Sequence, residues 1–233
     1  MKKFFTLIAT VAMATSMNAQ GTYAVQEGDN VKAGDQITSV ENITLTYMEK
    51  AGTAYSAAKK QTNWADADFV AYVSGKSNGK LVSGAEPTGC VYKFETAKAG
   101  SVTVGVQLNA KKGFHILDAD FAEVTPASYN LPSAKEGDSQ KFTENEKKEN
   151  IVAAKSNGTV TFNVADNGTY YVLATGTRLG FYGFKYEAGT STGISSIEAT
   201  SAKNDGKTYN MAGQQVSGSF KGLVIKNGKK FVK

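Results

Sequence analysis

Short stretches in which apolar and polar residues alternate recur along most of the chain, and Gly, Asn, Asp and Ser separate them. The clearest stretch places Val102, Val104, Val106 and Leu108 on one side of a strand and small or polar residues on the other. Alternation with this period is typical of a strand with one buried face. We therefore expect an all-β fold, an antiparallel two-sheet β-sandwich of jelly-roll type, with this stretch at the centre of a sheet.

The same alternation predicts further strands, and two Asn-Gly pairs predict turns. The predicted strands cover residues 43–48, 90–94, 114–117, 160–164, 169–174 and 179–186. Asn-Gly between alternating segments is a strong hairpin signal, so Asn157-Gly158 and Asn167-Gly168 are expected to be turns. Cys90 alternates with aromatic residues, so we expect it in the core rather than as a reactive thiol.

The pattern changes twice towards the C-terminus. Residues 133–155 are charged and nearly free of apolar side chains, which predicts a long surface loop. After the last predicted strand the chain becomes rich in small and polar residues, as linkers are. Two apolar, lysine-rich segments then flank Asn227-Gly228, which predicts a second small β unit. The expected organisation is a β-sandwich domain at 20–187, a linker at 188–206 and a C-terminal β module at 207–233.

The N-terminus has the three parts of a secretory signal peptide. A basic start precedes an apolar run over residues 4–13 and a small or polar stretch that ends at Ala19. We expect residues 1–19 to be removed on export. No later segment approaches the roughly 18 apolar residues that a membrane helix needs, so no integral membrane segment is expected in the mature protein. The single cysteine, Cys90, excludes an intramolecular disulfide. A lipid anchor is the competing export route, and it is disfavoured because it would need a cysteine at the end of the signal segment.

The formal net charge of +5 is concentrated at the ends of the chain. Lys2 and Lys3 belong to the predicted signal, and residues 221–233 hold five lysines and no acidic residue. The remaining body is slightly acidic and contains one arginine, Arg178. A nucleic-acid surface spreads Lys and Arg over a folded face, so a nucleic-acid partner is not expected.

The C-terminal segment carries a resemblance to a known class of domains. The matching residues are Thr192-Gly193-Ile194, Tyr209-Asn210, Gly213-Gln214, Gly222 and the lysine-rich end. Together they resemble the short C-terminal domain of proteins secreted by Gram-negative gut and oral bacteria, related versions of which serve as type IX secretion signals. The resemblance implies export and delivery to the outer surface of a Gram-negative bacterium, and it implies nothing about catalysis.

A second resemblance lies in the body, over residues 90–116 and 157–187. The order of strand, glycine turn and strand, ending in Thr-Arg-Leu-Gly-Phe-Tyr-Gly-Phe-Lys-Tyr, is similar to the non-catalytic β-sandwich modules that accompany polysaccharide-degrading enzymes of those bacteria. The resemblance implies a carbohydrate-binding-like module. A shared fold does not by itself fix a function.

The sequence offers little for catalysis. A serine triad or a histidine-rich metal site would have to use His115, the only histidine. It alternates with apolar neighbours, so we expect a surface-exposed or hydrogen-bonded strand residue. Glycoside hydrolysis needs only two carboxylates, but no pair stands out among the many acidic residues. No catalytic residue is assigned.

The repeated sequence Asp-Ala-Asp-Phe is the nearest candidate for a metal site. It supplies Asp66 and Asp68, and again Asp118 and Asp120. Alternate acidic residues on a strand would share one face and could join backbone carbonyls around a structural calcium ion, which takes about six to eight oxygen ligands. We favour the alternative that they form a polar strand edge whose charges oppose aggregation. No other cofactor is expected.

Glycan binding needs aromatic rings that lie against sugar faces, with a few polar groups beside them. Trp64, the single tryptophan, lies in a polar setting. Tyr182 belongs to one of two aromatic faces of its strand, of which one must line the core. Arg178 opens that strand, and its guanidinium could bind a sugar carboxylate through two hydrogen bonds. We therefore select Trp64, Arg178 and Tyr182 as candidate glycan-binding residues.

The leading hypothesis is a secreted or surface-displayed, non-enzymatic β-sandwich that binds a polysaccharide. The first alternative is a structural or protein-interaction component of the cell envelope, in which the polar faces would be solvated surface. A small glycosidase or polysaccharide lyase is the least favoured function. It would need an acidic or Lys/Tyr cleft, and no pattern in the sequence indicates one.

Overall fold

The structure is a computed structural model that describes residues 20–60, 66, 68–132 and 139–189, together with the backbone of 208–210, 223–226 and 229–232. The predicted signal peptide lies outside the described residues. The chain divides into two compact units, residues 1–190 and 191–233, and each is described by itself.

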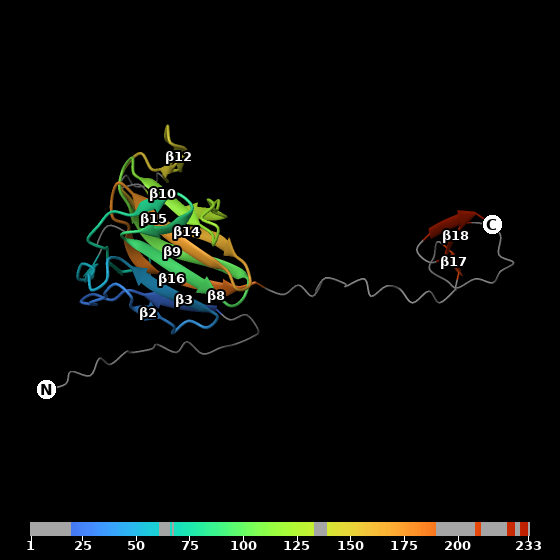
Figure 1. Cartoon of the computed structure of the whole chain (residues 1–233), viewed down its shortest axis with the longest axis horizontal. Coiled ribbons are helices and arrows are strands. Elements are labelled where there is room, and N and C mark those ends of the chain that lie inside the picture. Colours follow the sequence, from blue (N-terminus) through green and yellow to red (C-terminus); the bar gives the residue numbers. More distant parts are fainter. Residues whose placement is uncertain are drawn as a thin grey trace. The chain divides into compact units, whose positions relative to one another are not determined.

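The first unit consists of two large antiparallel sheets (Figure 1), which confirms the expected all-β two-sheet sandwich. The five-stranded sheet has the order β1 (Gln20–Ala24), β16 (Gly180–Ala188), β9 (Gly100–Leu108), β14 (Ser156–Val164) and β11 (Ser128–Asn130). The seven-stranded sheet has the order β12 (Thr143–Glu144), β13 (Asn150–Ile151), β10 (Gly113–Leu117), β15 (Thr169–Thr175), β8 (Val91–Thr96), β3 (Ile43–Met48) and β2 (Gln36–Ile37).

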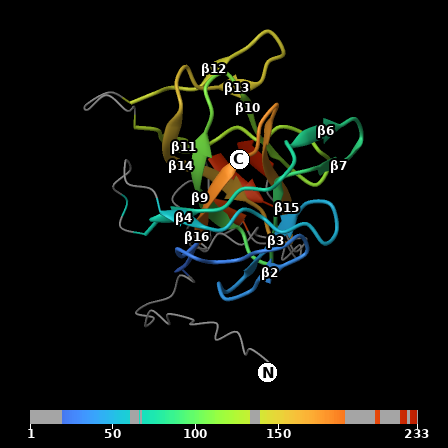
Figure 2. The ribbon, with the colours of Figure 1, turned by 90° about the vertical axis from the view of Figure 1, so that its left-hand side faces the viewer.

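Two short ribbons complete this unit. β4 (Lys59–Lys60) pairs with β5 (Ala71–Tyr72), and β6 (Lys80–Val82) pairs with β7 (Ala85–Thr88). The β6–β7 hairpin extends at the side of the sandwich (Figure 2), and its Leu81 and Val82 are 45% and 40% exposed.

Successive long strands alternate between the two sheets. From β8 through β9, β10, β14 and β15 to β16, each strand lies in the sheet opposite to the strand before it. The chain therefore winds around the core instead of forming paired hairpins. Asn167 adopts the left-handed conformation (φ 51°) in the turn after β14, as expected of Asn-Gly. However, β14 and β15 do not pair, so this turn crosses between sheets.

Aromatic rings fill the space between the sheets. The ring centroid of Phe94 in β8 lies 5.3 Å from that of Phe184 and 6.3 Å from those of Phe162 and Phe181. These three rings come from the other sheet. Tyr92 stacks on Phe181 at 4.3 Å. The predicted central strand is β9, between β16 and β14, and its inward valines are fully buried. Cys90 is fully buried in the same core, as expected.

Two local expectations were wrong. Asn157-Gly158 lies within β14, where Gly158 pairs with Val106 of β9. A side chain at Gly158 would overlap the Asn130 carbonyl of β11, so the glycine allows close strand approach and makes no turn. In the predicted loop 133–155, the two-residue strands β12 and β13 extend the seven-stranded sheet. Just before β12, the Phe142 ring stacks on Phe114 with 5.5 Å between the ring centroids.

A β-bulge interrupts β16 between Phe181 and Gly183. It lets Phe181 and Phe184 both face the core although two residues separate them. Gly183 has φ 133°, and a Cβ there would come within 2.8 Å of the Ala24 Cα and 3.0 Å of the Tyr23 carbonyl carbon in β1. Glycine is therefore required both for the backbone conformation and for the pairing with β1.

The second unit is a small three-stranded sheet. β18 (Leu223–Lys226) pairs with β19 (Lys229–Val232) across residues 227–228, which confirms the predicted hairpin pairing. β17 (Thr208–Asn210) adds a third antiparallel strand beside β18. The sequence pattern had not indicated this strand.

We predict that Gly183→Ala lowers the free energy of unfolding by roughly 2–4 kcal/mol, because backbone strain and steric overlap with β1 add. Gly28→Ala is the matched control. Gly28 also has positive φ, but nothing lies within 4 Å of an added Cβ, so we expect a loss of about 1 kcal/mol. Urea denaturation measures both, and equal losses would contradict the role of the bulge.

Candidate functional site

The outer face of the five-stranded sheet carries an aromatic pair at the start of β16. Val73, directly after β5, exchanges two backbone hydrogen bonds with Phe181 (3.0 and 2.8 Å). This pairing places Tyr72 opposite Tyr182, and the two rings lie 5.3 Å apart. Side chains from the two neighbouring strands of the sheet lie next to this pair. We call Tyr72, Gln107, Asn157, Gly180 and Tyr182 the outer-face cluster.

Tyr182 forms the base of this cluster. Its side chain is fully buried, and its hydroxyl donates a hydrogen bond to the Asn157 Oδ1 atom at 3.0 Å. The ring therefore offers no face to solvent, in contrast to the platform expected from the sequence. Tyr72, which the sequence did not single out, is only half-buried and is the accessible ring of the pair.

Gln107 is the unusual residue of the cluster. It is 8% exposed, and its Nε2 atom is the one buried side-chain nitrogen or oxygen without a hydrogen-bond partner in the described part of the chain. Gly180 lies beside it in the register of β9 and β16. A Cβ at Gly180 would lie 2.8 Å from the Gln107 Cβ and 3.1 Å from the Tyr72 ring. Because Gly180 has no side chain, Tyr72 and Gln107 lie on two sides of the open space above it.

Arg178 lies next to the cluster. Arg178 lies just before β16 and not within it, although the sequence placed it at the opening of the strand. It is exposed, and since only two residues separate it from Gly180, the two Cα atoms lie at most about 7 Å apart. Of the three residues selected from the sequence, Arg178 and Tyr182 thus lie near the same end of β16. Trp64 lies outside the described residues.

The segment after Trp64 is anchored on the same outer face. Phe69 is fully buried over Gly105 of β9, with its Cγ 2.9 Å from where a Cβ would stand. The Lys185 Nζ atom lies 5.2 Å from the Phe69 ring centroid and 2.6 Å from the Asp68 Oδ2 atom. A cation over a ring and an ion pair together fix this segment to β16.

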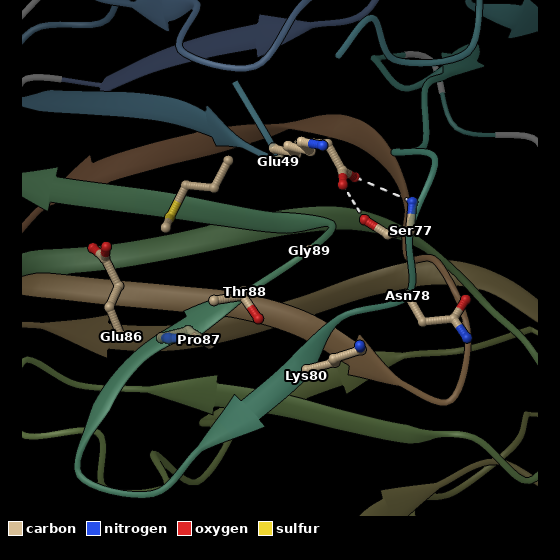
Figure 3. Close-up of a pocket in the computed structure, with 10 residues that line it drawn as sticks. Glu49, Ser77, Asn78, Lys80, Glu86, Pro87, Thr88 and Gly89 are labelled. Atoms are coloured by element: carbon tan, nitrogen blue, oxygen red, sulfur yellow. Dashed lines mark hydrogen bonds between the residues drawn. The ribbon is translucent and has the colours of Figure 1, made fainter. Parts of the chain in front are cut away.

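A pocket of about 310 Å³ opens at the end of β3, beside the β6–β7 hairpin (Figure 3). We call it the hairpin pocket. Its polar lining is Glu49, Lys50, Ser77, Asn78, Lys80, Glu86 and Thr88, and Met48, Pro87 and Gly89 complete it. In Figure 3, Glu49 lies across the pocket from the β6 and β7 side chains and points to Ser77.

Both carboxylates of the pocket accept hydrogen bonds from the protein. Glu49 accepts from the backbone N–H groups of Lys76 (3.2 Å) and Ser77 (3.3 Å) and from the Ser77 hydroxyl. Glu86 accepts from the Tyr171 hydroxyl at 3.0 Å. Burial and the hydrogen bond to Glu86 raise the pKa of Tyr171 to about 12.

Two lysines also line the pocket. Lys50 and Lys80 form no ion pair with the described residues. The pocket thus combines fixed acceptors with free donors.

His115 on β10 is a buried, hydrogen-bonded strand residue, one of the two positions expected for it. Its Nδ1 atom lies 2.5 Å from the Glu123 carboxylate, and its Nε2 atom lies 3.2 Å from the Thr175 hydroxyl oxygen. The Thr175 hydroxyl donates its proton to Glu149 at 2.9 Å, so its oxygen is an acceptor for His115. Both ring nitrogens therefore have an oxygen partner, and the ring is fixed from both sides.

This network adds side-chain hydrogen bonds to one end of the ladders that join β13, β10 and β15. It ties β10 and the end of β15 to the turn after β12 through Glu149, which also accepts from the Asn145 amide at 2.6 Å. Burial alone would raise the pKa of Glu149, but the hydrogen bonds from Asn145 and Thr175 and the charge of His115 outweigh it and hold that pKa below its ordinary value of 4.5. Because the Thr175 hydroxyl donates its hydrogen bond to Glu149, the contacts among His115, Thr175 and Glu149 stabilise the fold and do not activate the hydroxyl as a nucleophile.

The acidic pairs considered for calcium lie in turns, not along strands as expected. The Asp66 side chain accepts the Asp68 N–H at 2.9 Å. The Asp118 side chain accepts the N–H groups of Asp120 and Ala122, both at 2.9 Å. These contacts are Asx turns, in which the carboxylate stabilises local backbone. Among the described residues no group of three or more His, Cys, Asp or Glu is arranged to hold a metal ion.

The sequence matches no protein-family model and no curated protein. The described part of the chain contains no helix of the length and apolar character needed to cross a membrane. The hairpin pocket and the outer-face cluster are the two candidate sites of this chain.

We predict that the network around Glu149 contributes stability that is lost in acid. A carboxyl group whose pKa is lowered by folding stabilises the protein above its ordinary pKa of 4.5, and the contribution disappears as pH falls through the lower folded pKa. Glu149→Gln should therefore be less stable than wild type at pH 7 and approach it below pH 4. Urea denaturation across this range measures the difference.

Glu146→Gln is the control, because Glu146 is an exposed residue of the same turn. It should follow the wild-type curve at every pH. A constant difference between Glu149→Gln and wild type from pH 7 to the acid range would disprove the linkage.

Proposed function

We propose that the protein is a secreted or cell-surface β-sandwich that binds a glycan and is not an enzyme. The observation that carries the proposal is the hairpin pocket, where hydroxyl, amide, ammonium and carboxylate groups converge from the end of β3, the segment before β6, and β7. Sugar hydroxyls both donate and accept hydrogen bonds. A lining that offers both kinds of group suits them better than it suits an apolar ligand.

The size of the pocket supports a short stretch of a saccharide chain. Its volume of about 310 Å³ is at the lower end of the roughly 300–1,000 Å³ typical of ligand pockets. The pocket lies beside an exposed hairpin, so a longer chain could continue past it. We assign Asn78, Lys80 and Thr88 as donors to sugar oxygens and Glu86 as an acceptor for sugar hydroxyls.

The state of the two carboxylates supports binding rather than hydrolysis. A glycosidase uses one carboxyl group as an acid and the other as a base or nucleophile, with each free to reach the scissile bond. Glu49 is held by Ser77 and the adjacent backbone, and Glu86 is held by Tyr171. Groups held in this way are positioned acceptors.

The proposed location rests on the two ends of the sequence. The signal-peptide pattern at residues 1–19 and the C-terminal resemblance to type IX secretion-like domains both favour export to the outer surface of a Gram-negative bacterium. The compact second unit is the part of the chain to which we assign this sorting role.

The second candidate function is a structural or protein-interaction component of the cell envelope. One observation favours it: Leu81 and Val82 are exposed together on the β6–β7 hairpin, and clustered exposed apolar residues often mark protein contacts. In that case the hairpin, and not the pocket beside it, would be the functional feature.

A glycan array probed with the purified protein, followed by calorimetry with the retained glycan, tests the proposal. Asn78→Ala and Lys80→Ala should each weaken binding about tenfold, since each removes a hydrogen bond worth roughly 1.5 kcal/mol to the ligand. Lys155→Ala, at an exposed lysine outside the pocket, should bind as wild type. Retention of no glycan above background, or unchanged binding by both pocket variants, would refute the assignment.

A further inference from the structure

The amide of Gln107 is a structural anomaly on an otherwise well-satisfied sheet face. A buried donor without a partner destabilises the folded state, and native proteins contain few of them. Neighbouring outer-face residues do find partners: Thr103 bonds Thr161 at 2.8 Å, and Asn157 accepts from Tyr182. An apolar residue at 107 would avoid the cost. Residues that violate a folding rule in this way are concentrated at functional sites.

The surroundings of Gln107 are arranged like a binding site. Tyr72 meets it across Gly180, where any side chain would fill the space. Tyr182 follows the inward Phe181 and packs against Tyr72 on the outer face. The β-bulge lies directly beside it, and bulges are common next to functional sites. Tyr72 is the least buried ring of the cluster, so a shift of this one side chain admits an acceptor atom to the Gln107 Nε2 atom.

The chemistry around the cluster defines the ligand. The Tyr72 ring can pack against the apolar face of a sugar, as tyrosine does at many interfaces. The Gln107 Nε2 atom needs an acceptor, which a ring hydroxyl or carbonyl oxygen supplies. Arg178, about two residues from Gly180, has a planar guanidinium that matches a carboxylate. It has no ion-pair partner among the described residues.

We propose that the outer-face cluster is a second glycan-binding site, selective for a uronic acid residue, in which Tyr72 packs on the sugar ring, Gln107 donates to a ring oxygen and Arg178 binds the carboxylate. This site is separate from the hairpin pocket in residues and in ligand charge. It therefore goes beyond the function proposed for the pocket, and each site can fail without the other.

Calorimetric titration of the purified protein with an oligogalacturonate, and with a neutral oligoglucan, tests this site. Gln107→Leu should be at least as stable as wild type, because an unpaired amide is removed, and should bind the oligogalacturonate at least tenfold more weakly. Arg178→Ala should leave stability unchanged, weaken binding of the oligogalacturonate at least tenfold and reduce the salt dependence of binding.

The matched control is Asn163→Ala. Asn163 is exposed on the outer face of β14, and this variant should bind the oligogalacturonate as wild type does.

The outcomes separate this site from the pocket. Loss of oligogalacturonate binding in Gln107→Leu and Arg178→Ala, but not in Asn78→Ala, supports a second site. If Gln107→Leu gains stability and keeps full affinity, the amide is only a packing defect and the proposal is overturned. Arg178→Ala tests the site independently if Gln107→Leu fails to fold, because Arg178 is exposed. Failure of wild type to bind the oligogalacturonate also overturns it, whatever the pocket binds.

Discussion

The first unit depends on one constraint: β16 must deliver both Phe181 and Phe184 to the core between the sheets. These rings meet Phe94 and Tyr92 of the opposite sheet at 4.3–6.3 Å, and they are fully buried. Regular alternation would turn one of them outward. The bulge at Tyr182 and Gly183 lets both rings face the core. It requires a glycine at position 183, where φ is 133°.

The same bulge shapes the outer surface. Because Tyr182 turns outward there, it meets Tyr72 across the sheet and fixes Asn157. Core packing on one face of β16 thereby produces the outer-face cluster on the other. The hairpin pocket has a different origin, since it lies where Glu49 at the end of β3 binds the backbone of the segment before β6. The hydrogen-bond network of His115 joins a third region of the fold, and its contacts are structural.

Alternating patterns predicted the fold class, the central position of β9, the burial of Cys90 and the C-terminal hairpin, because strand periodicity reflects burial directly.

The sequence patterns failed where local signals compete with tertiary contacts. Asn157-Gly158 has the composition of a turn, yet contact with β11 requires Gly158 inside a strand. The sequence assigned Arg178 and Tyr182 to one strand, but Arg178 lies just before β16, and no sequence signal showed that Tyr72 packs against Tyr182. Similarly, Gln107 looks like an ordinary outward residue until its unpaired amide is seen.

Amide NMR of the purified protein, titrated with an oligogalacturonate and with a neutral oligoglucan, is the most direct test of glycan binding at the two proposed sites. With the charged ligand, shifts should cluster at the side-chain amide of Gln107 and at the backbone near Arg178. With the neutral ligand, they should cluster at Asn78 and Thr88. Absence of shifts with both ligands, or shifts confined to remote residues such as those of β2, would show that neither site binds these glycans.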